Sequence, residues 1–278
     1  MTTVIKVGGA RAVDPAGALA DVASLVEEGE QVVVVHGGST KVDETLERLG
    51  IEPEYVETPS GVVGRFTDET TMEVFEMAFG HLNTQLVAGL QSEGVDAVGL
   101  NGVDGKLLYG PRKSAVRVLE DGKKKIRRGD HSGSIKQVNG DLLESLLSDG
   151  YTPVAAPPMA GDDDGAVRPV NTDADRSAAA IAAELDATLV LLTDVAGVYE
   201  DPDDPATLVE SVETNAEWQA LEAAAEGFMS RKIMAAEEAL DGGSPEVVVA
   251  DANAESPILS ALSGDGTHMK AEAVEGDT

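Results

Sequence analysis

The sequence lacks cysteine, is poor in aromatic residues and contains no long apolar run. The absence of cysteine among its 278 residues excludes disulfides, thiolate metal sites and a cysteine nucleophile. No apolar run is long enough to cross a membrane, and no apolar signal segment precedes the first expected strand. With 42% hydrophobic residues, the chain can still bury a large core. We therefore expect a soluble, cytoplasmic protein.

Positive charge is also scarce. The chain has 20 Lys and Arg against 51 Asp and Glu, a formal net charge of −31. The acidic residues are spread along the whole chain, which is typical of halophilic proteins from a high-salt cytoplasm, whereas an acidic surface for one basic partner would predict a cluster. A charge of this size disfavours nonspecific binding to nucleic acid.

The few positive residues are concentrated between positions 106 and 136. Within this stretch, Val116–Leu119 and Lys125–Arg127 flank a tight Asp-Gly turn, which predicts a projecting β-hairpin. The hairpin is either a docking surface for an acidic partner or a solvated edge whose lysines prevent aggregation. Half of the 20 cations lie here: Lys106, Arg112, Lys113, Arg117, Lys123, Lys124, Lys125, Arg127, Arg128 and Lys136.

Two apolar strands are followed by glycine pairs. Thr3–Val7 is a β-branched run that contains Lys6 and leads into Gly8-Gly9, and Gln31–Val35 leads through a histidine into Gly37-Gly38. A lysine in a buried strand is costly without an anion, and glycines let backbone N–H groups approach that anion closely. Either pair alone could be an ordinary turn between strand and helix. Together with the lysine, the two pairs predict one phosphate-binding mouth.

Strands and helices alternate along the rest of the chain. This order predicts an α/β fold with a mainly parallel central sheet sandwiched by helices. No repeat or long linker divides the chain, so we expect a single domain over residues 1–278.

Five motifs occur in the order found in the amino acid kinase family. They are Ile5–Gly9, Val35–Gly38, Asn171–Asp175, Leu192–Tyr199 and Met229–Lys232. The chain resembles the acetylglutamate kinase branch of this family over nearly its whole length. The stretches 106–113 and 125–130 resemble a subgroup of that branch whose substrate is attached to a carrier protein. The chain has no Walker-type phosphate loop.

The resemblance implies a function. Kinases of this subgroup use ATP to phosphorylate the side-chain carboxylate of L-glutamate or L-2-aminoadipate, held by its amino group on a small acidic LysW-type carrier, in arginine or lysine biosynthesis. It further implies the carbamate kinase-like fold, a homodimer, and Mg²⁺ bound with the nucleotide. Residues 1–150 would form the substrate side, and residues 151–278 the ATP side.

The resemblance also assigns roles to residues. Lys6 and Lys232 would stabilise the transferring phosphoryl group and the departing ADP, while Asp175 holds both lysines. The predicted substrate-binding residues are Gly37, Gly38, Arg65 and Asn171. The predicted ATP-binding residues are Gly8, Gly9, Thr193, Asp194 and Tyr199. The predicted carrier-docking residues are Arg112, Lys113, Arg117, Arg127 and Arg128.

Other interpretations remain open at this stage. Lys232 could be an exposed helix lysine, and Asp175 could simply occupy a first helical turn, where acids are favoured. We expect His36 to pack in its loop, and the sequence gives no sign of a partner for His268. Arg65 lies later than in the Gly-x-Arg element that is common in acetylglutamate kinases. The alternative functions are N-acetyl-L-glutamate kinase, acting on the free small molecule, and a non-catalytic nucleotide-binding regulator.

Overall fold

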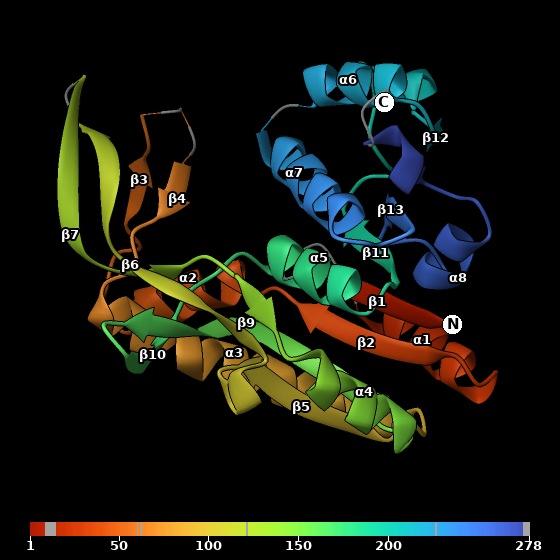
Figure 1. Ribbon diagram of the computed structural model, residues 1–278, viewed down its shortest axis with the longest axis horizontal. Coiled ribbons are helices and arrows are strands. Elements are labelled where there is room, and N and C mark those ends of the chain that lie inside the picture. The colour runs from red at the N-terminus through yellow and green to blue at the C-terminus, as the bar shows by residue number, and fades with distance from the viewer. Residues whose placement is uncertain (9–14, 60, 62, 121, 226, 275–278) are drawn as a thin grey trace.

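The computed structural model describes residues 1–8, 15–59, 61, 63–120, 122–225 and 227–274. It confirms an α/β fold in which helices cover both faces of one large sheet (Figure 1). The helices are α1 Ala16–Glu27, α2 Ser39–Arg48, α3 Glu69–Ser92, α4 Gly140–Ser148, α5 Ala174–Glu184, α6 Asn215–Ala224, α7 Gly227–Asp241 and α8 Pro257–Leu262. Among the described residues, no helix is both long and apolar enough to cross a membrane.

The large sheet has 12 strands in the order β12-β14-β13-β11-β1-β2-β9-β6-β7, with β5 and β10 on β9 and β8 on β6. Its strands are β1 Thr2–Val7, β2 Gln31–His36, β5 Ala97–Gly102, β6 Leu108–Glu120, β7 Lys123–Gly133, β8 Gln137–Val138, β9 Thr152–Asp163, β10 Ala166–Val170, β11 Thr188–Thr193, β12 Ser211–Val212, β13 Glu246–Asp251 and β14 Thr267–Lys270. The central pairings are parallel, and β6–β7, β6–β8, β9–β10 and β13–β14 are antiparallel. A separate antiparallel pair consists of β3 Tyr55–Glu57 and β4 Val63–Arg65.

Alternate residues of the central strands enter two different cores. Val4 of β1 packs in a cluster with the inner faces of α4, α5 and α7, whereas Ile5 packs with α1, α8 and the end of α3. Burial on both faces explains why β1, β2, β11 and β13 are nearly continuous apolar runs. Side chains two residues apart lie on the same face of a strand, so Lys6 is on the α5 side with Val4.

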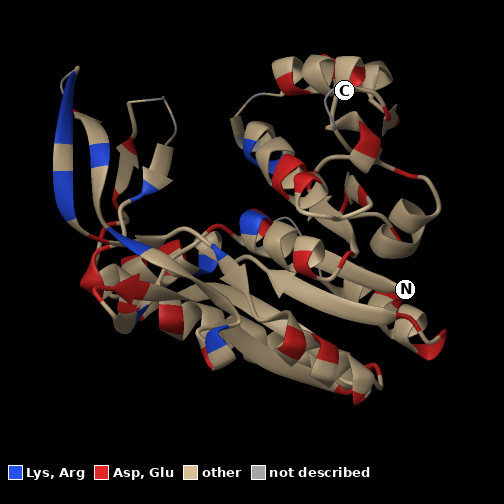
Figure 2. Ribbon diagram, viewed as in Figure 1, with Lys and Arg blue, Asp and Glu red and all other residues tan. Residues whose placement is uncertain are grey.

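The predicted hairpin is present, but it is longer than the sequence indicated. β6 has 13 residues and β7 has 11, and their tips rise from the sheet beside β3 and β4 (Figure 1). Gly110 and Pro111 concealed the first half of β6, because both residues are rare in strand interiors. Figure 2 shows the concentration of positive charge on these two strands. Asp121, in the predicted turn, lies outside the described residues.

Asp21 joins α1 to α8. Its side chain is buried and accepts hydrogen bonds from the backbone N–H groups of Ile258 at 2.8 Å and Leu259 at 3.2 Å. Ser256, at the N-cap position of α8, makes no side-chain capping bond. Asp21 therefore caps α8 from a distant part of the sequence.

Replacing Asp21 with alanine is expected to lower the free energy of unfolding by about 1–3 kcal/mol, because two buried donors lose their acceptor. Urea unfolding followed by circular dichroism measures this loss. Asp21→Asn keeps an acceptor oxygen and should lose less. A wild-type unfolding midpoint for Asp21→Ala would contradict the capping role.

Candidate active site

Three charged side chains from three elements meet on the α5 face of the sheet. The Nζ of Lys6 on β1 lies 2.7 Å from Oδ1 of Asp175 on α5, and the Nζ of Lys232 on α7 lies 3.1 Å from Oδ2 of the same carboxylate. Both lysines are at least nine-tenths buried. The structure thus brings together the three residues that the sequence predicted to be catalytic, and it excludes an exposed position for Lys232.

The local sequence explains this convergence. Asp173 is the N-cap of α5 and accepts from the N–H groups of Asp175 and Arg176 at 2.9 and 3.1 Å, which starts the helix and fixes Asp175 in its first turn. Ala178, Ala179 and Ala182 are fully buried, and their small side chains let α5 pack closely between the sheet and α7. Lys6 and Lys232 therefore approach the Asp175 carboxylate from two sides.

The cluster carries more positive than negative charge. Burial alone would raise the pKa of Asp175, but the two neighbouring ammonium groups reverse this effect, so its pKa lies below the usual value and it remains ionised. Burial, followed by repulsion from Lys6, lowers the pKa of Lys232, and Asp175 offsets part of this shift. One carboxylate faces two buried ammonium groups, and Oδ1 of Asp175 receives no aligned hydrogen bond. An anion such as a phosphate would balance this arrangement.

The glycine loops lie at the carboxyl ends of β1 and β2. These strands run parallel and pair directly, and the N–H of Gly37 donates to the carbonyl of Val7 at 3.1 Å, which joins the two loops. A Cβ on Gly38 would come within 2.9 Å of Leu82 and 3.0 Å of Phe79, so a larger residue there would require these α3 side chains to shift. Gly8 is half-buried beside them, and Gly9 lies outside the described residues.

The other three predicted ATP-binding residues, Thr193, Asp194 and Tyr199, lie at and after the end of β11, the strand next to β1 in the sheet. Thr193 is buried at the end of β11, and its hydroxyl donates to the carboxylate of Asp194 at 3.2 Å. The loop that follows, which leads to Tyr199, is held by Thr267 on β14. The hydroxyl of Thr267 accepts from the N–H of Val198 at 2.8 Å and donates to the carbonyl of Val209 at 2.6 Å. Sequence reasoning missed Thr267 because no local pattern links positions so far apart.

Arg65 already has partners within the chain. Its guanidinium pairs with Asp43 on α2, donates to the hydroxyl of Tyr55 at 2.9 Å and stacks over the ring of that tyrosine. The Tyr55 hydroxyl in turn donates to Asp43 at 2.9 Å. A substrate carboxylate would have to share Arg65 with Asp43 or displace that carboxylate, so binding of the substrate by Arg65 stays a prediction.

Asn171 lies where the hairpin base meets the segment leading to α5. Its side chain donates to the hydroxyl of Thr67 at 3.3 Å, and its backbone bonds to His131 and Gly133. The buried Asp130 completes this junction by accepting from the Thr67 N–H at 3.2 Å. The junction connects the hairpin to the start of α5, although substrate binding by Asn171 stays a prediction.

The predicted carrier-docking residues fall into two groups. Arg112 pairs with Asp163 at 2.7 Å and donates to the Asp130 carbonyl, while Arg127 pairs with Glu54 and lies over the Phe66 ring. These two arginines fasten the hairpin to the rest of the molecule. The exposed members of the predicted set are Lys113, Arg117 and Arg128.

His36 lies on the opposite face of the sheet from Lys6. Its ring is buried and stacks on Phe79 with centroids 5.7 Å apart, and its Nε2 is 3.3 Å from Nδ2 of Asn83. This placement agrees with the packing role that the sequence indicated. Burial lowers the pKa of His36 to about 4, and a hydrogen bond with the Gly37 carbonyl opposes only part of this shift.

The low pKa of His36 predicts a loss of stability in acid. Between pH 6.5 and 4 the unfolded chain binds a proton at this position and the folded chain does not, so the free energy of unfolding should fall by about 3 kcal/mol as the pH is lowered through this range. Urea unfolding at stepped pH measures the slope. His36→Gln should flatten it, whereas His81→Gln, which removes an exposed histidine from α3, should leave it unchanged. An unchanged slope in His36→Gln would refute the assignment.

His268 has a partner that the sequence did not indicate. On β14 its Nδ1 lies 2.8 Å from Oε1 of Glu246 on β13, and Lys270 reaches the same oxygen at 2.6 Å. The three residues are brought together by the antiparallel pairing of β13 with β14. The cluster lies at the start of β13, whereas the glycine loops follow the carboxyl ends of β1 and β2, so we assign it a structural role.

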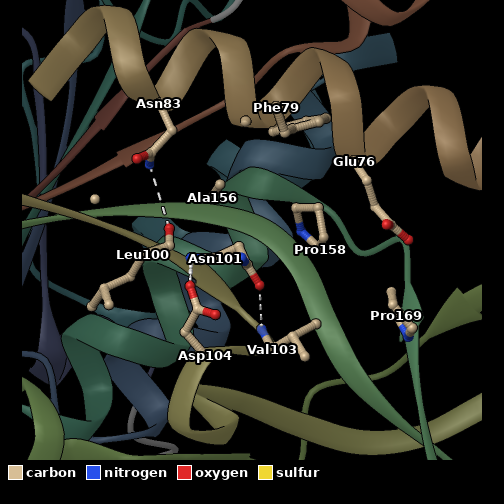
Figure 3. Close-up of a pocket in the computed structure, with 12 residues that line it drawn as sticks. Glu76, Phe79, Asn83, Leu100, Asn101, Val103, Asp104, Ala156, Pro158 and Pro169 are labelled. Carbon is tan, nitrogen blue, oxygen red and sulfur yellow. Dashed lines mark hydrogen bonds between the residues drawn. The ribbon is translucent and has the colours of Figure 1, made fainter.

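A cavity of about 310 Å³ lies on the α3 face near the edge strand β5 (Figure 3). Its walls come from α3, β5, the loop after β5, and β9 and β10. They include Glu76, Phe79, Asn83, Asn101 and Asp104 but no lysine or arginine. Phosphoryl transfer requires positive groups around the phosphates, so this cavity does not fit the predicted reaction. The described residues contain no group of three or more His, Asp or Glu side chains that could hold a metal ion.

A model of the amino acid kinase family matches residues 1–251. The chain belongs to this family. It is 44% identical to the [LysW]-aminoadipate kinase of Thermus thermophilus over 273 residues, which cover 96% of this chain and 99% of the relative. It is 42% identical to the acetylglutamate kinase of Methanopyrus kandleri over 270 residues, with 96% and 99% coverage. It is 34% identical to the [LysW]-aminoadipate/[LysW]-glutamate kinase of Sulfolobus acidocaldarius over 248 residues, with 88% and 92% coverage.

Solved structures of amino acid kinase folds resemble the whole chain. The N-acetylglutamate synthase of Neisseria gonorrhoeae superposes with a TM-score of 0.77 and 26% identity; the match covers 100% of this chain and 60% of the synthase. The carbamate kinase of Giardia lamblia bound to AMP-PNP has a TM-score of 0.67 and 16% identity, with 97% and 98% coverage. These similarities agree with the fold predicted from the sequence.

Proposed function

We propose that this amino acid kinase uses ATP to phosphorylate the side-chain carboxylate of glutamate or 2-aminoadipate carried on LysW, for arginine or lysine biosynthesis. The observation that carries the proposal is the buried Lys6–Asp175–Lys232 cluster, whose surplus positive charge lies beside two glycine loops. Relatives at 34–44% identity that are named for LysW-linked substrates supply the substrate class.

The cluster suits transfer of a phosphoryl group between two anions. The acceptor carboxylate is already ionised at neutral pH, so the reaction needs alignment and charge neutralisation and no general base. Lys6 stabilises the charge on the transferring γ-phosphoryl group, and Lys232 stabilises the charge that develops on ADP. Asp175 holds both ammonium groups in place through its two oxygens. Backbone N–H groups of Gly8, Gly9, Gly37 and Gly38 bind phosphate and acyl oxygens.

Other residues complete the site in this proposal. Arg65 and Asn171 bind the amino acid, and Thr193, Asp194 and Tyr199 contact the nucleotide. Residues 1–150 form the substrate side, and residues 151–278 form the ATP side. Magnesium accompanies ATP and takes its ligands mainly from the nucleotide phosphates and water, as is common for Mg²⁺ in kinases.

The acidic carrier binds the outer face of the hairpin. In the β6–β7 register, Arg117 lies opposite Ile126, and Lys124 and Arg128 lie on the same face. All four are exposed, with Ile126 at 68%. The face thus offers cations around an apolar centre. In about 1 M salt the Debye length is roughly 3 Å, so these cations act through direct contacts with carboxylates and not through long-range attraction.

Reversing two charges on this face should weaken carrier binding selectively. The double variant Arg117→Glu/Arg128→Glu is expected to raise the KM for the charged carrier on the order of 100-fold, since two charge-assisted contacts of roughly 1.5 kcal/mol each correspond to a factor of this size. The KM for ATP should not change. Arg48→Glu, on an exposed part of α2, is the control. An unchanged carrier KM in the double variant would show that the carrier binds elsewhere.

The assembly and setting are also part of the proposal. In the described residues β5 pairs with β9 on one side and ends the sheet on the other, which would allow a second copy to continue the sheet in a homodimer. Light scattering in molar KCl tests this state. The spread of acidic residues favours a halophilic, cytoplasmic protein.

The second candidate is N-acetylglutamate kinase, which phosphorylates a free small molecule. It is favoured by the 42% identity to the Methanopyrus kandleri enzyme. The same lysine cluster would serve either substrate, so the two functions differ in what the hairpin does.

Hydroxylamine trapping tests the reaction class. An acyl phosphate reacts with hydroxylamine to form a hydroxamate, which adds a fixed mass to the acceptor. Incubation with Mg-ATP, hydroxylamine and aminoadipate-charged or glutamate-charged carrier should yield carrier hydroxamate. ATP hydrolysis without hydroxamate on any carboxylate acceptor would contradict the proposal, as would nucleotide binding without turnover, the result expected of a regulator.

A further inference from the structure

Two adjacent cations in the second turn of α7 contact different parts of the molecule. Lys232 reaches Asp175 on α5, inside the lysine cluster. Arg231, the preceding residue, extends away from that cluster, and its Nη2 donates to the backbone carbonyl of Val63 on β4. This bond joins segments 168 positions apart in the sequence.

The β3–β4 pair that receives this bond is separate from the large sheet. It is tied to the first half of the chain by side chains at the end where Tyr55 pairs with Arg65. Arg65 pairs with Asp43 on α2, and Arg127 of the hairpin pairs with Glu54, the residue before β3. Arg231 adds a bond from the second half of the chain. The β3–β4 pair is therefore held between the two halves.

Both partners of this bond lie next to residues of the predicted active site. Arg65 is two residues after Val63, and Lys232 directly follows Arg231. One hydrogen bond thus connects the strand that carries the predicted substrate-binding arginine to the helix turn that carries the phosphate-binding lysine. The acceptor is a main-chain carbonyl, so the bond does not depend on the side chain at position 63.

We propose that Arg231 is a positioning residue that sets the placement of the amino acid acceptor relative to the phosphate-binding lysines. Arg231 need not touch either substrate. A hydrogen bond between a guanidinium and a neutral carbonyl is modest in strength, so it can open when a substrate enters and re-form when both sides are filled. The kinetic part of this inference rests on the function proposed above.

Hydrogen exchange tests the link without turnover. AMP-PNP binding should slow amide exchange in residues 53–66 of the wild-type protein, because ordering α7 also orders the strand bonded to it. Arg231→Ala should lose this protection while still binding AMP-PNP. Arg176→Ala is the matched control: it removes an ion pair between α5 and Glu238 of α7, entirely within the second half of the chain. Equal protection in wild type and Arg231→Ala would overturn the proposal, as would loss of protection in Arg176→Ala.

Kinetics distinguish a positioning role from a structural one. Arg231→Ala should raise the KM of the carboxylate acceptor roughly tenfold and lower kcat, with the KM for ATP nearly unchanged, because misplacement affects the acceptor and the transfer step. Arg231→Lys should recover part of the loss. Val63→Ala should behave as wild type, since the carbonyl remains. If Arg231→Ala is active and its acceptor KM is unchanged, the role proposed for Arg231 is wrong, while the proposed function still stands. If the wild-type protein is inactive, the proposed function is contradicted, and the exchange experiment decides the role of Arg231.

Discussion

Lys6→Ala is expected to lower kcat for phosphoryl transfer by about 10³-fold or more, because it removes a buried positive group from the place where charge moves between nucleotide and acceptor. The fold should survive this change. Without Lys6, the Asp175 carboxylate keeps Lys232 as its partner at 3.1 Å, so the remaining pair is electrically balanced. The loss of activity would therefore arise from the reaction itself and not from unfolding.

Coupled-enzyme measurement of ADP release, together with AMP-PNP binding by calorimetry, tests this prediction. The variant should bind the nucleotide with a Kd within roughly tenfold of wild type, corresponding to no more than about 1.4 kcal/mol. Lys41→Ala removes a half-buried lysine of α2, whose ammonium lies 4.0 Å from Glu44, and should retain full turnover. If Lys6→Ala kept a kcat close to that of wild type, the lysine cluster would not be the catalytic centre.

Unlike Lys6→Ala, Asp175→Ala is expected to destabilise the folded protein. The free energy of unfolding should fall by about 3–5 kcal/mol, in addition to the loss of activity. Removing the carboxylate leaves the ammonium groups of Lys6 and Lys232 buried and facing each other. Salt screens buried charges less than exposed ones, so the effect should persist in molar KCl. Guanidinium unfolding is unsuitable because the denaturant is itself a salt; urea unfolding at fixed KCl measures the change.

A double variant tests whether the loss of stability comes from repulsion between the two lysines. In the Asp175→Ala background, Lys6→Ala removes the repulsion and should restore part of the lost stability, although the same change in the wild type should not stabilise the protein. The contribution of Asp175 should also depend on pH. Because its folded pKa lies below the ordinary value of about 3.9, the stabilisation is present above that value and is lost as the pH falls through the lower folded pKa. Additive effects of the two changes would contradict direct coupling.

The central sheet was predictable because local patterns determine it. Short β-branched apolar runs such as Gln31–Val35 and Thr188–Leu192 predict strands buried on both faces, and the helices between them favour parallel order. Parallel order places the ends of β1, β2 and β11 at one edge, which is why the glycine loops and the Thr193 loop lie near one another. The lysine cluster itself was predicted from resemblance, and the structure supplies its geometry.

The features that the sequence did not reveal depend on partners far apart in the chain. Asp43 reaches Arg65 across 22 positions and Glu54 reaches Arg127 across 73, and no periodicity in the sequence encodes either pair. The pairing of β14 with β13, which gives His268 its partner, is equally remote from local pattern. Composition predicted that the hairpin would be cationic. It could not show that two of the five predicted docking residues are used to fasten the hairpin in place.

The identity of the acceptor tests the account most directly. The measurement is ADP release in molar KCl with Mg-ATP, comparing kcat/KM for glutamate-charged and aminoadipate-charged carrier with kcat/KM for free N-acetylglutamate. The account predicts turnover with the charged carrier and at most weak turnover with the free compound. Efficient turnover with N-acetylglutamate and none with either charged carrier would contradict it, and would reduce the hairpin to a charged edge of an acetylglutamate kinase.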